Sequence, residues 1–257
     1  MTALEISNVD SGAQEVVVAK LSRPEVRNAI DETMVAELHE LCDQLERDPK
    51  ILIITGCIAE TSKGPRGIFA SGADIAQLKE RRREDALRGI NNTIFTRIAN
   101  LPAPVIAAVD GFALGGGLEL ALAADFRVAT PKAKFGQPEA NLGIVAAAGA
   151  LWRLKACVGL PLAREILMAG KIIDGAQAHE AQLVNELAEP DNLLAQAHDL
   201  ATRIAQLDPL AVRMTKQLLA MPESAHPMVD NIAQAVLFES PAKFDRMQAF
   251  LDKKKGK

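Results

Sequence analysis

A carboxylate stands inside a strongly apolar stretch of the chain. Residues 110–125 read DGFALGGGLELALAAD, and Glu119 is the only charged residue between the two terminal aspartates. If this stretch is a buried helix, the carboxyl group is costly to ionise and its pKa rises, which is typical of acid/base sites. The alternative is that Glu119 lies near the helix start and stabilises the helix dipole.

Three glycines precede this carboxylate. Gly115, Gly116 and Gly117 follow a predicted strand and open the predicted helix, so unobstructed backbone N–H groups lie at its positive end. Their spacing fits neither common phosphate-binding glycine pattern and instead favours a hole for one negatively charged oxygen. The alternative is close packing of the backbone against a neighbouring segment.

Two further segments carry groups suited to the same chemistry. The segment KFGQPEANLGIV holds a second carboxylate, Glu139, which could be an acid/base group or a surface turn residue. In FASGADI, the N–H of Ala73 follows a glycine and could be presented without obstruction. The alternative there is a tight turn that closes on Asp74.

The elements that must position these groups alternate up to about residue 190. Apolar runs predict strands at 15–22, 51–57, 103–111 and 125–130, and the intervening patterns predict helices at 31–47, 79–101 and 146–158. Only helices follow, at 192–207, 209–220, 225–238 and 242–253. The first of them has an apolar face that we expect to be covered by oligomerisation, formed by Leu193, Leu194, Ala197, Leu200 and Ile204. We therefore expect an α/β core with the active site over residues 1–190 and a helical region over 191–257.

Composition excludes several classes of protein. The 257 residues are 49% hydrophobic and 24% charged with a net charge of −4, which is typical of a globular protein and argues against nucleic acid as a partner. No run of about 18 residues lacks a charge, and the start MTALEISNVD has no basic region, so we expect no membrane span, no signal peptide and a cytoplasmic location. The three cysteines and four histidines show no metal-ligand spacing.

Taken together, FASGADI, DGFALGGGLELALAAD, KFGQPEANLGI and RPEVRNAI resemble the enoyl-CoA hydratase/isomerase, or crotonase, family over nearly the whole chain. The resemblance implies a crotonase-like α/β fold with a spiral ββα core. It also implies that the C-terminal helices mediate oligomerisation, into a trimer or a dimer of trimers.

The resemblance further implies a reaction. In the family, two backbone N–H groups hold the thioester carbonyl, and Ala73 and Gly116 match them. Glu119 and Glu139 match the two glutamates that hold one water in the hydratases. The implied activity is the reversible syn addition of water across the 2,3 double bond of a 2-enoyl-CoA, in fatty acid or related acyl-CoA degradation. It needs no metal and no cofactor beyond the CoA of the substrate.

A CoA-binding groove is implied in the same way. It would be formed by residues from two segments: Arg23, Val26, Arg27, Ala29, Ala70, Asp74 and Ile75. The alternative for Arg23 and Arg27 is solvated surface charge.

Three features depart from the family pattern. GIVAAAGALWRL replaces a segment that usually reads GxxPGxGGTQRL, the loop over 57–67 is longer than usual, and the chain has no tyrosine. The last departure argues against the branch that acts on hydroxyphenyl substrates through a tyrosine. The acyl group, the roles of the two glutamates and the direction of the reaction stay open.

Other functions remain possible at this point. One is a Δ3,Δ2-enoyl-CoA isomerase or another crotonase-fold acyl-CoA reaction. Another is a non-catalytic member that binds acyl-CoA or RNA as a scaffold. The presence of Glu119 and Glu139 argues against a scaffold, and the net charge of −4 argues against RNA.

Overall fold

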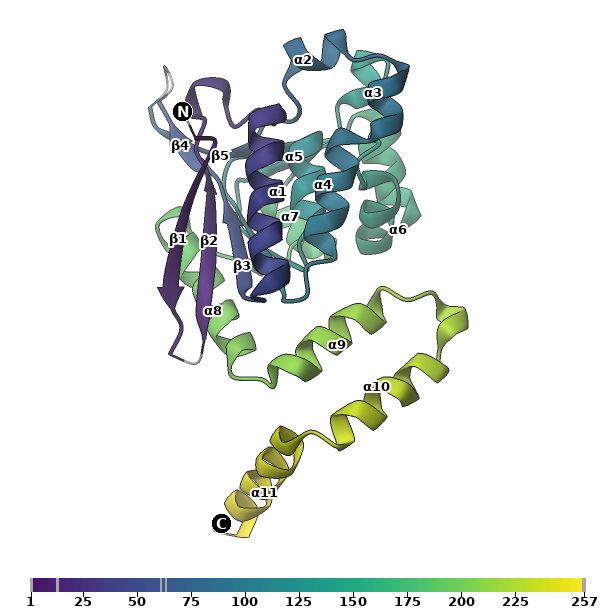
Figure 1. Cartoon of the computed structure of the whole chain (residues 1–257). Helices are drawn as coiled ribbons and strands as arrows, with labels where there is room; N and C mark the ends of the chain where they lie inside the picture. Colours follow the sequence, from purple (N-terminus) through teal and green to yellow (C-terminus); the bar gives the residue numbers. More distant parts are fainter. Residues whose placement is uncertain (1, 13, 61, 63, 256–257) are drawn as a thin grey trace.

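The computed structural model describes residues 2–12, 14–60, 62 and 64–255 and contains two β-sheets flanked by helices (Figure 1). The six-stranded sheet has the order β1 (Leu4–Asp10), β2 (Glu15–Leu21), β3 (Ile51–Thr55), β6 (Val105–Val109), β8 (Phe126–Ala129) and β11 (Glu186–Leu187). The five-stranded sheet has the order β10 (Ile173–Asp174), β9 (Lys134–Gly136), β7 (Phe112–Leu114), β5 (Arg66–Ala70) and β4 (Cys57–Ala59).

The α-helices of the described chain divide between the sheets and the C-terminal region. The first group is α1 (Glu32–Arg47), α2 (Ile75–Glu80), α3 (Arg83–Arg88), α4 (Ile90–Ala99), α5 (Gly116–Ala123), α6 (Ala150–Ala169) and α7 (Gly175–Glu180). The second group is α8 (Leu193–Ala205), α9 (Pro209–Leu219), α10 (Met228–Phe238) and α11 (Pro241–Lys255).

The chain visits the two sheets in turn, which produces a spiral. β6 lies in the six-stranded sheet, β7 follows in the five-stranded sheet, and α5 completes the unit; β8, β9 and α6 repeat this order. The pair β6–β8 is parallel, and so is the pair β7–β9. Every residue of β6 is buried, as expected for a parallel strand covered on both faces. The predicted crotonase-like spiral ββα core is thus confirmed.

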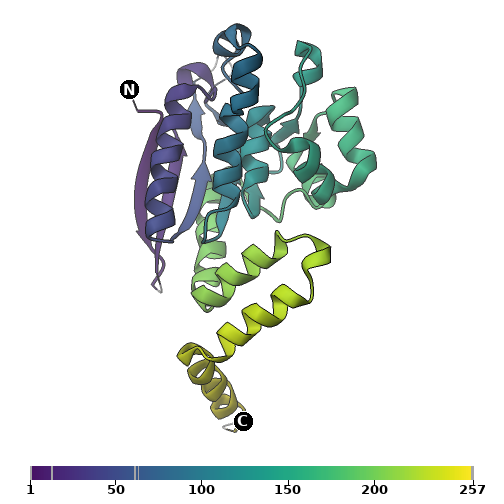
Figure 2. The ribbon, with the colours of Figure 1, turned by 45° about the vertical axis from the view of Figure 1, so that its right-hand side comes forward.

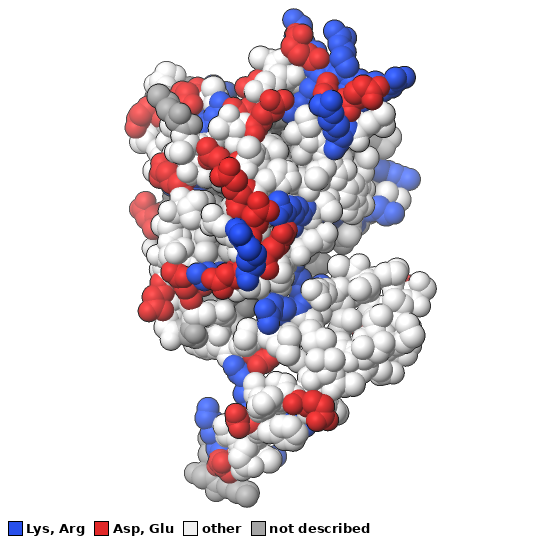
Figure 3. All heavy atoms as spheres, viewed as in Figure 1, with Lys and Arg blue, Asp and Glu red and all other residues white. Residues whose placement is uncertain are grey.

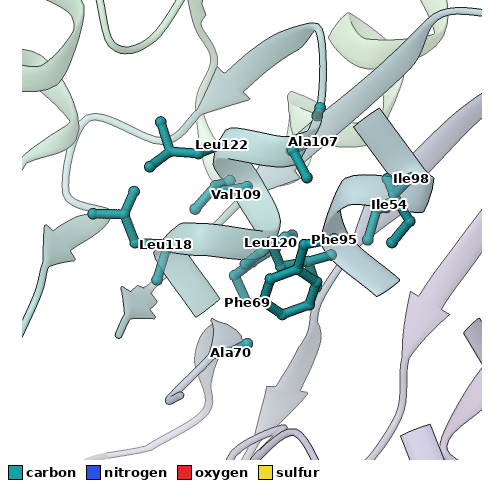
Figure 4. Close-up of a cluster of buried hydrophobic side chains, with 14 of the residues drawn as sticks. Ile54, Phe69, Ala70, Phe95, Ile98, Ala107, Val109, Leu118, Leu120 and Leu122 are labelled. Atoms are coloured by element: carbon teal, nitrogen blue, oxygen red, sulfur yellow. The ribbon is translucent and has the colours of Figure 1, made fainter. Parts of the chain in front are cut away.

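Helix α5 lies in the centre of the hydrophobic core (Figure 4). All of its residues are buried, so no face of the helix reaches solvent. Leu118 and Leu120 pack in one cluster with Phe69 of β5 and Phe95 of α4. The helix that carries Glu119 is therefore buried on all sides, as its composition predicts.

Two predicted elements are broken at glycines. The predicted strand 51–57 ends at Gly56, where any side chain would collide with the carbonyl of Ile68, and the chain crosses there to the second sheet. The predicted helix 79–101 is in fact α2, α3 and α4, because Arg81 is extended and Gly89 is left-handed (φ 62°). These two residues change the direction of the chain between α2, α3 and α4.

Other predictions missed elements or their ends. The helix predicted at 146–158 begins at Ala150 and continues to Ala169, with a non-helical Gly159 inside it. The edge strand β1 was missed because six of its seven residues are exposed, so it lacks an apolar run. Within the longer loop expected at 57–67, β4 and β5 form an antiparallel pair, and residues 61 and 63 lie outside the described chain.

Helix α8 covers the outer face of the six-stranded sheet. Leu193, Ala197, Leu200 and Ile204 are buried there against β2, β3, β6 and β8. The expectation that these residues form an unpaired face for oligomerisation is wrong, because the sheet itself covers them. Lys216 of α9 pairs with Asp125 (2.7 Å) and so holds α9 against the body, whereas α10 and α11 extend away from it (Figure 2). The division of the chain into two regions at residue 190 stays a prediction. No helix of the described chain is long and apolar enough to cross a membrane.

Candidate active site

The Glu119 carboxylate does not cap its own helix. Its Oε1 accepts hydrogen bonds from the backbone N–H groups of Ala148 (2.7 Å) and Ala150 (3.1 Å). Ala150 is the first residue of α6, so the carboxylate lies at the N-terminus of a different helix. With only 4% of the residue exposed, Glu119 is a buried charge tied between α5 and α6. The sequence suggested that Glu119 stabilises the dipole of its own helix, but in the structure its carboxylate bonds the backbone at the start of α6.

Burial decides the ionisation of Glu119. Desolvation raises its pKa to about 7, although the hydrogen bonds from Ala150 and Ala148 oppose this rise. The charge of Glu139 raises the pKa further, while that of Arg153 lowers it. At neutral pH the group is therefore close to half-protonated and suited to both accepting and donating a proton.

The second carboxylate, Glu139, lies next to the glycine segment. It begins a 3₁₀ turn after β9, and its Oε1 lies 2.7 Å from the point where a Cβ on Gly115 would stand. Gly115 also has a positive φ of 53°, so two independent reasons require glycine there. Burial raises the pKa of Glu139 as well. Burial thus shifts the pKa of both carboxyl groups in the same direction.

Gln137 is hydrogen-bonded to the carboxylate of Glu139. It is buried, and its amide nitrogen donates to Glu139 Oε2 (2.7 Å) and Oε1 (3.0 Å). This residue belongs to the FGQPE segment, yet its role was not recognised from the sequence. The signal available was a polar residue between the buried Phe135 and Gly136 of β9 and a proline.

The backbone of Ala73 lies beside that of Gly116. Residues 30 and 73 form an isolated parallel bridge in which Ile30 N donates to Gly72 O (2.8 Å) and Asp74 N donates to Ile30 O (3.0 Å). These two bonds do not use the N–H of Ala73. Its nitrogen lies 3.4 Å from the point where a Cβ on Gly116 would stand. Gly116 begins α5, where the first N–H groups have no partner within the helix.

Close packing also explains one of the glycines. A Cβ on Gly117 would collide with the carbonyl of Ala70 at the end of β5. Close packing is therefore the reason for glycine at position 117, whereas the use of the Gly116 N–H to hold an oxygen stays a prediction.

These groups line a cavity of about 790 Å³. Of the residues expected from the sequence, the cavity brings together Ala73, Ile75, Gly116, Glu119 and Glu139. Its apolar wall adds residues that the sequence reasoning did not assign: Leu78, Leu142, Ile144, Val145, Ala147 and Ala148. The departing segment GIVAAAGALW thus supplies much of that wall.

The remaining residues expected to bind CoA lie outside the cavity lining, and two of them have structural roles. Arg23 forms an ion pair with Asp31 (3.0 Å) and donates to the carbonyl of Ala29 (2.6 Å). Asp74 caps α2 by accepting from Gln77 N (3.0 Å).

The other four differ in exposure. Arg27 is exposed in a left-handed conformation, Val26 is half-buried, and Ala29 and Ala70 are buried. These residues differ in their distance along the chain from the bridge between Ile30 and Ala73. Arg23, Val26, Arg27 and Ala29 come shortly before Ile30, whereas Ala70 comes shortly before Ala73.

The raised pKa of Glu119 has a consequence for stability. Ionising Glu119 costs more free energy in the folded state than in the unfolded state, so ionisation lowers the free energy of unfolding. This loss of stability is absent below about pH 4.5, grows as the pH rises to about 7 and is constant above that. We expect Glu119→Gln to unfold with a free energy roughly 2–3 kcal/mol higher than the wild type at pH 8, but nearly equal at pH 4.5. Urea unfolding at both pH values measures this difference.

An exposed carboxylate provides the control for this experiment. Glu189→Gln should change the stability by the same small amount at both pH values. If the stability of Glu119→Gln relative to the wild type is the same at pH 4.5 and pH 8, burial does not raise the pKa of Glu119.

No cluster of three or more potential metal-ligating side chains occurs within the described ranges. The polar groups described above in the cavity wall are carboxyl side chains and backbone N–H groups. This arrangement can bind an oxygen that gains negative charge and can move protons on the same wall of the cavity.

Comparisons with known proteins show the family to which the chain belongs. Residues 11–257 match the model of the enoyl-CoA hydratase/isomerase family. The chain is 34% identical to the short-chain-enoyl-CoA hydratase of Clostridium acetobutylicum, covering 98% of this chain and 97% of that protein. It is also 34% identical to the crotonyl-CoA hydratase of Syntrophomonas wolfei, covering 95% and 94%.

Solved structures are similar over the same extent. The enoyl-CoA hydratase from Bacillus anthracis superposes with a TM-score of 0.88 at 28% identity, covering 98% of this chain and 96% of that one. An enoyl-CoA hydratase subunit from Geobacillus kaustophilus gives a TM-score of 0.85 at 33% identity, covering 98% and 97%. The chain belongs to the enoyl-CoA hydratase/isomerase family.

Proposed function

We propose that this protein is an enoyl-CoA hydratase that adds water reversibly across the 2,3 double bond of a 2-enoyl-CoA. The observation that carries the proposal is the pairing of Glu119 and Glu139, both with a raised pKa, on one cavity beside the N–H groups of Ala73 and Gly116. Hydration needs two proton-transfer groups of different protonation and a site for charge on oxygen. The isomerase alternative requires only one carboxylate, so it leaves the other unexplained.

The geometry supports the following course of reaction. The thioester oxygen binds between the N–H groups of Ala73 and Gly116, and one water lies between the two carboxyl groups. The ionised carboxylate takes a proton from the water as its oxygen bonds to C3, and the negative charge moves to the thioester oxygen. The protonated carboxyl then donates its proton to C2. Both groups lie on one side of the substrate, so addition is syn.

The return to the starting state needs only a proton exchange between the two glutamates. After one turnover the acid has become the base and the base the acid. The pKa of each group is raised by burial, which favours a carboxyl group that can hold a proton as well as release it. The reaction as proposed uses no metal and no cofactor beyond the CoA of the substrate.

The CoA moiety is proposed to lie along Arg23, Val26, Arg27 and Ala29, beside Ala70, Asp74 and Ile75. Because Arg23 is engaged by Asp31, Arg27 is the exposed cation of this group that is left for a phosphate. The bridge between Ile30 and Ala73 connects this segment to the thioester site.

Crotonyl-CoA is the substrate of choice for a test. Two similar proteins are named for short-chain or crotonyl thioesters, which supports a short acyl group here. We expect loss of the conjugated thioester absorbance and formation of 3-hydroxybutyryl-CoA. Turnover of 3-butenoyl-CoA to crotonyl-CoA without net hydration would favour the isomerase, and binding without turnover would favour a scaffold.

The C-terminal helices support the proposal of a trimer or a dimer of trimers. Large apolar side chains of α10 and α11 are exposed on the single chain: Met228, Ile232, Val236, Phe238, Phe244, Met247, Phe250 and Leu251. The surface over α9 and α10 carries few charges (Figure 3). Exposed apolar surface of this extent is typical of a protein interface.

We expect light scattering to give at least three times the 27.5 kDa of one chain. Ile232→Asp and Phe250→Asp should shift this mass toward the monomer, because each buries a charge in the interface. Glu239→Gln, an exposed change at the end of α10, is the control. A wild-type protein that is monomeric at micromolar concentration contradicts the proposal.

A further inference from the structure

The side chain of Asn91 is an amide with unused hydrogen-bonding capacity in the wall of the cavity. It lies in the first turn of α4, and its Oδ1 is buried without a partner among the described residues. Only one other buried side-chain atom of the described chain is in this state, Nε of Arg81, which lines the same cavity. Oδ1 is an acceptor and cannot bond the carbonyl oxygen of a ligand, so the atom of this side chain that can do so is the donor Nδ2.

The neighbouring asparagine shows what a purely structural amide does at this place. Asn92 donates from Nδ2 to the carbonyl of Ala147 (3.0 Å) and accepts from Thr96 Oγ1 (3.0 Å). It therefore ties α4 to the wall segment 144–148. Asn91 makes no such bond within the described chain, although it lines the same cavity.

The position of Asn91 relates it to the thioester site. Its Nδ2 lies 3.6 Å from the point where a Cβ on Gly116 would stand, and the nitrogen of Ala73 lies 3.4 Å from that same point. The side-chain nitrogen and the backbone nitrogen thus border one small volume beside Gly116. An oxygen that accepts from the N–H of Ala73 in this volume would also lie within reach of Nδ2.

We infer that Asn91 is a third hydrogen-bond donor to the thioester oxygen, beside the backbone N–H groups of Ala73 and Gly116. The inference rests on the proposed function, which places that oxygen. Asn91 is then a catalytic residue, because its donor meets the charge that develops on oxygen as water adds. A neutral amide suits this role, since it donates without attracting either glutamate to form an ion pair.

Three variants test the inference. Asn91→Leu removes the donor at similar size, and Asn91→Asp keeps the shape but places a carboxylate beside the developing charge. Asn92→Leu makes the same chemical change at the adjacent residue, whose amide is already occupied. Circular dichroism and urea unfolding establish which variants are folded.

The first readout is kinetic. We expect Asn91→Leu to lower kcat for crotonyl-CoA about 10- to 100-fold with KM changed less than threefold, because the donor acts mainly in the transition state. Asn91→Asp should lose more than Asn91→Leu. If both Asn91 variants stay within twofold of the wild-type kcat, the inference is overturned.

The second readout reports the oxygen directly and does not depend on turnover. Crotonyl-CoA labelled with ¹³C at the carbonyl is bound to Glu119→Gln, which should turn over slowly, and its isotope-edited infrared band is recorded. We expect the bound band to lie below that of the free thioester. Adding Asn91→Leu should remove part of this shift, whereas adding Asn92→Leu should preserve it.

The outcomes separate the inference from the proposed function. A band unchanged by Asn91→Leu overturns the inference even if hydration is fast. Wild-type protein that binds crotonyl-CoA but fails to hydrate it overturns the proposed function, while the infrared band still decides whether Asn91 bonds the oxygen. A bound thioester with the frequency of the free one contradicts the site for the oxygen altogether.

Discussion

Replacing Glu119 or Glu139 with glutamine is expected to lower the rate of crotonyl-CoA hydration by roughly 10²–10⁴-fold. Glutamine preserves the size of either side chain and most of its hydrogen bonds, but it cannot exchange a proton. Glu119→Gln can still accept from Ala148 and Ala150, so the contact between α5 and α6 should persist. Binding of the thioester should therefore change far less than turnover.

Steady-state kinetics at equal concentrations of folded protein measure this effect. Glu165→Gln, an exposed carboxylate of α6 paired with Lys171, is the matched control and should hydrate at the wild-type rate. Near-wild-type turnover by Glu119→Gln would eliminate the two-carboxylate mechanism. Loss in Glu139→Gln alone would favour the isomerase.

The double variant adds a sharper criterion. Two groups that share one water and one proton act as a unit, so removing the second costs little once the first is gone. We expect the double variant to lose much less activity than the product of the two single losses. Multiplicative losses would mean that Glu119 and Glu139 act in separate steps.

The second large effect is expected at Gly116. Gly116→Pro removes the N–H proposed to hold the thioester oxygen and should lower kcat about 10²- to 10³-fold with both carboxylates intact. Proline is tolerated at the first position of a helix, which Gly116 occupies in α5, so the helix should still form. Steady-state kinetics and circular dichroism together test this expectation.

The adjacent glycine supplies the contrast. A Cβ on Gly117 would collide with the backbone of Ala70, so Gly117→Ala should lower the free energy of unfolding. Any residual folded Gly117→Ala protein should keep more activity than Gly116→Pro. If Gly116→Pro is folded and fully active, the proposed site for the oxygen is wrong.

The order of elements and the buried nature of α5 could be predicted from the sequence because both depend on local patterns. A strand such as β6 is apolar along its whole length, and α5 is apolar on every side, so hydrophobicity alone indicates burial. The breaks at Gly56 and Gly89 could not be predicted. Glycine permits several backbone conformations, and the packing of distant segments selects among them.

The acidic residues of the site show the same division. The type of Glu119 and its apolar surroundings predicted a raised pKa, because desolvation follows from the local sequence. Its partners at residues 148 and 150 lie about thirty positions away, and nothing local specifies that approach. The resemblance to the family supplied the pairing with Glu139, which composition and periodicity could not.

The sequence by itself thus determined which residues could do the chemistry and that most of the chain before residue 190 alternates between strands and helices. Only the tertiary structure decided what each one contacts. Arg23 has the charge of a phosphate ligand, yet the fold pairs it with Asp31. Asn91 looks like an ordinary polar helix residue, yet the packing of α4 against α5 places its amide beside Gly116. Charge and polarity are properties of a residue, whereas a partner is a property of the packed chain.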